Sequence, residues 1–132
     1  MKCLATIVLY RLPISVNHAY PQSRTGRRYL SPEGKAFKEE IGWEAKKVYK
    51  LPPNEDNLVL GLYFSWKDKR RRDCQNYIKL IADALEGIIV LDDKQFTSGT
   101  WNRQYLGIDR ILIKVWDGAQ SAVDNSDIDI GL

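Results

Sequence analysis

A short basic segment and two groups of acidic residues could together support metal-dependent cleavage of a phosphodiester. Residues 67–72 hold five cations and one aspartate, Asp73 follows at once, and Asp92 and Asp93 come later in the chain. Carboxylates bind hard divalent cations through oxygen, and such a cation polarises a phosphoryl group or lowers the pKa of an attacking water. Lys and Arg stabilise the charge that develops on the phosphate in the transition state. These residue types favour phosphodiester chemistry, although Asp-Asp turns and arginine-rich loops also occur in proteins that are not enzymes.

The positive charge is concentrated in one part of the chain. The 132 residues carry 20 Lys and Arg against 17 Asp and Glu, a net charge of +3. Four of the acidic residues lie after position 116, so the first 116 residues hold 20 basic and 13 acidic residues, a net charge of +7. More than half of this excess lies in residues 67–72. We expect this segment to bind phosphates, and the alternative is a solvated loop.

The composition of the chain excludes several other classes of protein. With 44% apolar residues and 28% charged residues, the chain is neither disordered nor membrane-spanning, and no secretory signal is apparent, which predicts a cytoplasmic protein. Cys3 and Cys74 have no paired spacing and are predicted to be free thiols. His18 is the only histidine, which argues against a zinc cluster or a histidine-centred triad. We expect one domain in residues 1–118 and an acidic, disordered tail in residues 119–132.

The hydrophobic pattern predicts an α+β domain, a small mixed β-sheet with two α-helices packed on one face. Ser31 and Pro32 are typical of a helix start, and Pro52 ends that helix. A second helix is expected at about residues 75–86, followed by Gly87. Strands are expected at residues 4–10, 58–66, 96–105 and 110–116.

The second predicted helix has one apolar face and one polar stripe. Asn76, Lys79 and Asp83 share the polar side at 100° per residue. A long basic loop precedes the first helix and could stack on or clamp DNA through its aromatic and basic residues. These residues are Tyr20, Arg24, Arg27, Arg28 and Tyr29. The four tryptophans, Trp43, Trp66, Trp101 and Trp116, are interpreted as core residues because they fall in regular elements.

Several separated motifs resemble the RusA family of Holliday-junction resolvases. Residues 70–79, 83–87 and 91–95 are similar to that family's RRD-x-DN-x-x-K, D-A-L and DD-x-Q motifs, and residues 12–20 and 29–34 are similar to its opening loop and first helix. The resemblance implies a Mg²⁺-dependent, homodimeric endonuclease, usually prophage-borne, that nicks four-way DNA junctions symmetrically.

The resemblance also implies roles for individual residues. Asp73, Asp93 and Lys79 would be catalytic, and Asp83 would support Lys79 from one helical turn away. The candidate metal ligands are Asp73, Asp93, Gln75 and Asp92. The candidate DNA contacts are Lys67, Lys69, Arg70, Arg71, Arg72, Asn76, Arg24, Arg27 and Arg28.

Gln75 departs from the family pattern, which has an acidic residue at this position. The site would then hold one negative charge fewer, and the affinity for a divalent cation depends on ligand charge. Three explanations are open: a weakened or inactive protein that still binds junctions, compensation by Asp92 or Asp68, or a deliberate change. An RNA-binding module is the least favoured alternative, because the aromatic strand motif of such modules is missing.

A four-way junction has two-fold symmetry, so paired nicks require two copies of a chain with one candidate site. Leu4, Ile7, Leu9 and Trp116 could supply an apolar surface for such a homodimer. The alternative is that they fill the monomer's own core.

Overall fold

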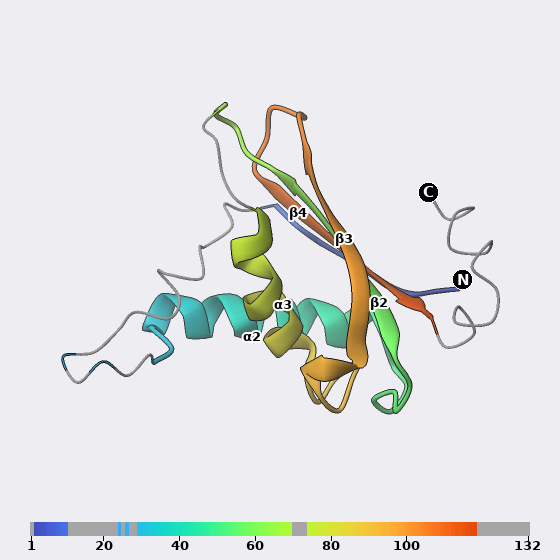
Figure 1. The fold of residues 1–132 in the computed structure, drawn as a ribbon. Coiled ribbons are helices and arrows are strands. Elements are labelled where there is room, and N and C mark those ends of the chain that lie inside the picture. Colours follow the sequence, from blue (N-terminus) through green and yellow to red (C-terminus); the bar gives the residue numbers. More distant parts are fainter. Residues whose placement is uncertain (1, 11–23, 25, 27–28, 70–73, 119–132) are drawn as a thin grey trace.

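The computed structural model describes residues 2–10, 24, 26, 29–69 and 74–118. They form a four-stranded mixed sheet with two α-helices, which confirms the predicted α+β class. The strands lie in the order β1-β4-β2-β3, and both helices cover one face of the sheet (Figure 1). The elements in chain order are β1 (Cys3–Leu9), α2 (Pro32–Val48), β2 (Leu58–Ser65), the 3₁₀ helix η1 (Cys74–Tyr77), α3 (Ile78–Leu85), the 3₁₀ helix η2 (Asp93–Gln95), β3 (Phe96–Gln104) and β4 (Arg110–Asp117).

Helix α2 begins where the sequence predicts. The Ser31 hydroxyl oxygen accepts a hydrogen bond from the Gly34 N–H at 3.0 Å, and Pro32 occupies the first helical position. Phe37, Ile41 and Ala45 form its buried stripe. Val48 was expected on the same stripe and is 48% exposed, because it lies in the last turn before the chain leaves the helix.

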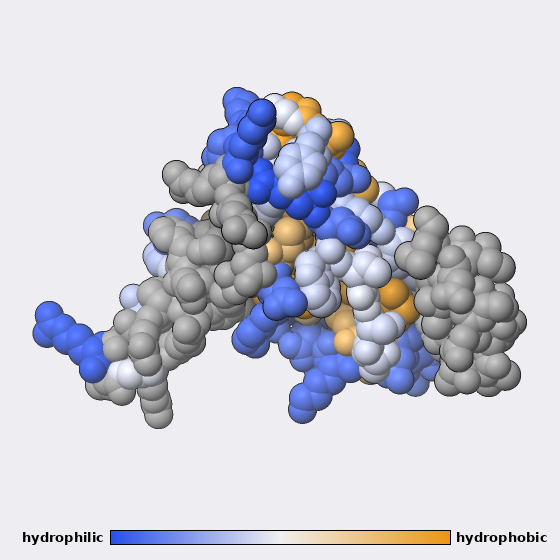
Figure 2. All heavy atoms as spheres, turned by 45° about the horizontal axis from the view of Figure 1, so that its top comes forward, coloured by the Kyte–Doolittle hydropathy of each residue, from blue (hydrophilic) through white to orange (hydrophobic). Residues whose placement is uncertain are grey.

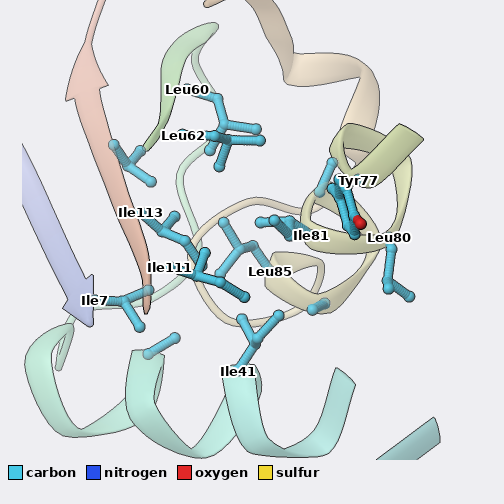
Figure 3. Packing of buried hydrophobic residues seen from close by; sticks show 14 of the residues in the cluster. Ile7, Ile41, Leu60, Leu62, Tyr77, Leu80, Ile81, Leu85, Ile111 and Ile113 are labelled. Atoms are coloured by element: carbon cyan, nitrogen blue, oxygen red, sulfur yellow. The ribbon is translucent and has the colours of Figure 1, made fainter. Parts of the chain in front are cut away.

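The core lies between the sheet and the helices. Ile7 of β1, Leu60 and Leu62 of β2, and Ile111 and Ile113 of β4 point toward the helices (Figure 3). On the opposite side, Ile41 of α2 and Leu80, Ile81 and Leu85 of α3 meet them. This apolar contact fixes the position of α3 relative to the sheet, and the polar side chains that α3 carries depend on that position.

Strands β2 and β3 pair in parallel, and the chain between them forms η1, α3 and η2. The link from β3 to β4 is short and contains Gly107, whose φ is +72°. The sequence predicts this link, but the strands that it joins are not neighbours, because β2 lies between them and pairs antiparallel with β4. The predicted second helix is also divided, since its first turn is 3₁₀ and its α-helical part ends at Leu85.

Two interpretations of apolar residues were wrong. Trp43 and Trp101 are 67% and 42% exposed, whereas Trp66 is buried as expected. Ile7 and Leu9 fill the monomer's core, so they offer no surface to a second copy, and Leu4 is half-buried against the same core. Cys3 and Cys74 form no disulfide, as predicted.

Part of the predicted organisation lies outside the described residues. It comprises Arg70, Arg71, Arg72 and Asp73, most of the basic loop before α2, and the tail at residues 119–132. Among the described residues, no helix is both long enough and apolar enough to cross a membrane.

Candidate functional site

Three carboxylates gather where α3 ends and η2 begins. One side-chain oxygen from each of Asp83, Glu86 and Asp93 lies within 4.8 Å of the others. We call this group the acidic cluster. Asp83 and Asp93 are half-buried and Glu86 is exposed, so the group is open to a ligand from solvent.

The end of α3 supplies two of the three side chains. Asp83 lies in the last turn, and Glu86, three residues later, is the C-cap of the helix. Gly87 then adopts a φ of +79°, which lets the chain turn back toward the helix. The Glu86 Oε1 accepts a hydrogen bond from the Asp93 backbone N–H at 2.7 Å, and this bond brings η2 against the end of α3.

Asp92 and Gln95 hold the turn that carries Asp93. The Asp92 Oδ1 accepts a hydrogen bond from the Lys94 N–H at 2.9 Å, which caps η2. The Gln95 Oε1 accepts hydrogen bonds from the backbone N–H groups of Leu91 and Asp92, both at 2.9 Å. Its Nε2 donates to the backbone carbonyls of Asn54 and Asp56, both at 2.8 Å. One glutamine therefore ties the acidic turn to the segment that enters β2.

The neighbouring carboxyl groups shift the pKa values of the two aspartates in opposite directions. The pKa of Asp93 is raised to about 6, first by its side-chain hydrogen bond with Asp83, then by partial burial and by Asp92 and Glu86. The pKa of Asp92 lies below its usual range, mainly because its carboxylate accepts the Lys94 backbone N–H. Of the two neighbours, Asp93 is the one that holds its proton more tightly.

The donor set of the acidic cluster fits a hard divalent cation. Its ligand atoms are all carboxylate oxygens, which Mg²⁺ and Ca²⁺ prefer. The cluster lies at the C-terminal end of a helix, where the helix dipole already disfavours negative charge. A bound cation would relieve both this effect and the mutual repulsion that raises the pKa of Asp93.

The raised pKa predicts how the metal-free protein responds to pH. A carboxyl whose pKa is higher in the folded state stabilises the fold while protonated, so its contribution is lost as pH rises from about 4 to about 6. In EDTA, the free energy of unfolding of the wild type should fall over this range relative to that of Asp93→Asn. Urea denaturation of both proteins at several pH values measures this difference, and parallel curves would contradict the prediction.

Lys79 lies one helical turn before the acidic cluster. Its Nζ is 3.4 Å from the Asp83 Oδ2, as the sequence suggests for these two positions, and its side chain is 66% exposed. An exposed ammonium beside the carboxylates can reach a phosphate bound there.

The described part of the basic segment is held against the link between β3 and β4. The Lys67 N–H donates to the Asp109 Oδ1 at 2.9 Å, and the Arg103 Nη2 donates to the Asp68 carbonyl at 2.9 Å. The guanidinium of Arg103 also lies 5.1 Å from the ring centroids of both Trp66 and Tyr105. In Figure 2, hydrophilic and hydrophobic residues lie side by side at this end of the molecule. The lysines Lys67 and Lys69 are exposed there.

The structure separates some of the predicted site residues. Gln75 lies in η1, before α3, whereas Asp93 follows the other end of that helix. Helix α3 itself advances about 10 Å along its axis from Ile78 to Leu85 at the usual rise per residue, and Gln75 lies before its start. Of the other predicted site residues, Asp92 lies next to the acidic cluster. The backbone of Asn76 belongs to η1, and the side chain of Arg24 is exposed. The predicted residues Asp73, Arg70, Arg71, Arg72, Arg27 and Arg28 lie outside the described residues.

Sequence reasoning missed two residues of this arrangement. Glu86 follows Asp83 by three positions, a spacing that places both side chains on one helical face, and this signal was available. Arg103 had no comparable signal, because its partners Trp66 and Tyr105 are brought to it only by the fold.

A set of carboxylates beside Lys79, on a domain that also exposes Lys67 and Lys69, offers the residue types that metal-dependent phosphodiester cleavage uses. The sequence profile described as Endodeoxyribonuclease RusA matches residues 12–116. This match covers most of the chain, which therefore belongs to the RusA family of endodeoxyribonucleases. One relative, the crossover junction endodeoxyribonuclease RusA of Aquifex aeolicus (strain VF5), is 22% identical over 111 residues, 83% of this chain and 88% of the relative.

Proposed function

We propose that the protein is a Mg²⁺-dependent, structure-selective endonuclease that resolves Holliday junctions by paired symmetric nicks. The observation that carries this proposal is the acidic cluster in a chain of the RusA family. The family supports branched DNA as the substrate, and cysteines that form no disulfide are in keeping with a cytoplasmic location.

The residues of this chain have distinct tasks in the proposed reaction. Asp83, Glu86 and Asp93 would hold the metal, and Lys79 would neutralise charge on the scissile phosphate. When bound, Mg²⁺ supplies polarisation of the phosphoryl group and a lowered pKa for the attacking water. Lys67 and Lys69 would bind phosphates further along the DNA. Asp73 was also predicted as a metal ligand, and this stays a prediction because Asp73 lies outside the described residues.

The test is incubation of the purified protein with a labelled synthetic four-way junction, with and without Mg²⁺. Nicks near the crossover that require Mg²⁺ support the proposal. A retarded but uncut junction instead supports the alternative, a weakened or inactive junction-binding protein, which Gln75 favours because it lacks the charge of the family's acidic residue. A preference for RNA would contradict both.

Substitution of Gln75 separates these two candidates further. The described carboxylates meet at the far end of α3 from Gln75, so Gln75→Asp is expected to leave the Mg²⁺ affinity of the acidic cluster within about twofold. Calorimetric titration of Mg²⁺ measures this affinity. Markedly tighter binding together with faster cleavage would show that position 75 itself completes the metal site, and that the natural glutamine weakens the enzyme.

A homodimer is part of the proposed function, because two opposed strands must be cut. With Ile7 and Leu9 in the core, the remaining candidate surface is the sheet face away from the helices, where the half-buried Trp116 ring packs over Gly61. Light scattering at micromolar concentration is expected to give twice the 15.2 kDa mass of one chain. The mass of a single chain, both free and on a junction, would contradict this.

A further inference from the structure

A groove runs between α2 and α3 beside the acidic cluster. It has a volume of about 660 Å³, and Asp83 and Glu86 are among its lining residues. The two helices cross here (Figure 1), and a Cβ at Gly42 would lie 3.2 Å from the Ile88 Cδ1 and 3.9 Å from the Ala84 carbonyl oxygen, so α2 packs closely against α3 and the segment that follows it. A ligand bound at the acidic cluster would therefore extend into this groove.

The α2 side of the groove presents an exposed aromatic ring among charged residues. Trp43 is 67% exposed, although tryptophan in a helix usually packs into the core. The Lys46 Nζ lies 5.7 Å from the centre of its ring, and Lys38 lines the same groove. Aromatic rings interleaved with lysines are typical of surfaces that bind single-stranded or opened nucleic acid.

The charges that line the groove indicate under which conditions a nucleic acid strand can bind there. Its lining holds the carboxylates of Glu39, Asp83 and Glu86 against the two lysines, so without a cation it repels phosphates. A divalent cation at the acidic cluster would reverse this balance. Binding of a nucleic acid strand in the groove should therefore depend on the metal.

Building on the proposed function, we infer that this groove holds the DNA strand next to the scissile phosphodiester, with a base stacked on Trp43 and a neighbouring phosphate paired with Lys46. Trp43 is then a positioning residue. It touches the substrate beside the reacting phosphate and aligns that phosphate with the carboxylates and Lys79.

The test measures binding of a synthetic four-way junction in Ca²⁺, chosen as a divalent cation to limit cleavage, and in EDTA. Trp43→Ala should weaken binding roughly 5- to 100-fold in Ca²⁺ and leave it unchanged in EDTA, and Trp43→Phe should restore most of the loss. Trp101→Phe is the matched control, because Trp101 is exposed on β3 and does not line this groove. Tryptophan emission should be quenched by the junction in Ca²⁺, and this quenching should be smaller in Trp43→Phe and retained in Trp101→Phe.

Other outcomes would overturn the inference. One is that Trp43→Ala binds the junction as tightly as the wild type, and another is that it loses affinity equally in Ca²⁺ and in EDTA. A third is that light scattering shows dissociation of a dimer that accounts for the lost affinity. Should Trp43→Ala fail to fold, Lys46→Gln tests the same groove, with an expected decrease of about one unit in the salt dependence of binding. A wild type that does not cut junctions contradicts the proposed function alone, because the Ca²⁺-dependent contribution of Trp43 is measured from binding.

Discussion

Asp93→Asn is expected to reduce Mg²⁺-dependent cleavage of a four-way junction at least about 100-fold, while junction binding measured in EDTA stays intact or improves. Stabilisation of transition-state charge by a metal ion amounts to several kcal/mol, and each 1.4 kcal/mol is a factor of ten in rate. Asn keeps the shape of the side chain and removes its charge, so attraction of phosphates cannot decrease for electrostatic reasons. Single-turnover cleavage in Mg²⁺ and gel retardation of the same junction in EDTA measure the two effects separately.

Asp92→Asn is the matched control for this substitution. It removes the same charge one residue away, and Asn is as good as Asp at the N-cap of η2. Cleavage by this variant should stay within a few-fold of the wild type. An equal loss of cleavage in both variants would show that Asp92 is a metal ligand too, as the resemblance implies. A loss of junction binding in both variants would show that the two aspartates have a structural role.

Replacing Lys67 and Lys69 by alanine should weaken binding to every DNA sequence and decrease the slope of log K against log[salt] by about two units. Both lysines are exposed on the segment that Asp109 and Arg103 hold against the β3–β4 link, so their ammonium groups can meet phosphates without rearrangement of the fold. Titration of a fluorescent junction at several salt concentrations gives this slope.

A double substitution of Lys35 and Lys47 removes the same charge from exposed positions of α2 outside the groove. It should change the slope much less. Equal slopes for the wild type and the Lys67/Lys69 variant would indicate that this part of the basic segment is only a solvated loop.

Local signals predicted much of the fold. The Ser31 cap and Pro32 define the start of α2, and the alternation of Leu58, Leu60 and Leu62 defines the buried face of β2. The position of β3 beside β2 was not predictable, because the short link to β4 is compatible with a hairpin as well. Strand order depends on packing between distant segments, which no local pattern records.

The candidate site was predictable in part. The Asp-Asp turn and the basic segment are visible as runs of charge, and Asp93 does lie in a group of carboxylates. Its partners Asp83 and Glu86 were not assigned as ligands, because Asp83 was interpreted as a partner of Lys79 alone. The exposure of Trp43 could not be predicted, since a tryptophan at a helical position has the same sequence pattern whether its face is covered or forms the wall of a groove.

The acidic cluster comes from one continuous stretch, residues 83–93, closed by the bond between Glu86 and Asp93. Closing so short a loop requires little chain entropy, and the stretch is tied to the rest of the domain by α3, by the fully buried Ile89 and Val90, and by Gln95. Residues 91–95 are exposed or half-buried, so this turn can open as a small unit while Ile89, Val90 and the sheet stay in place. The backbone amide hydrogens of this turn would then exchange with solvent faster than those of β2 or β4. Binding of a cation to the acidic cluster would slow the exchange of the turn and leave that of the strands unchanged.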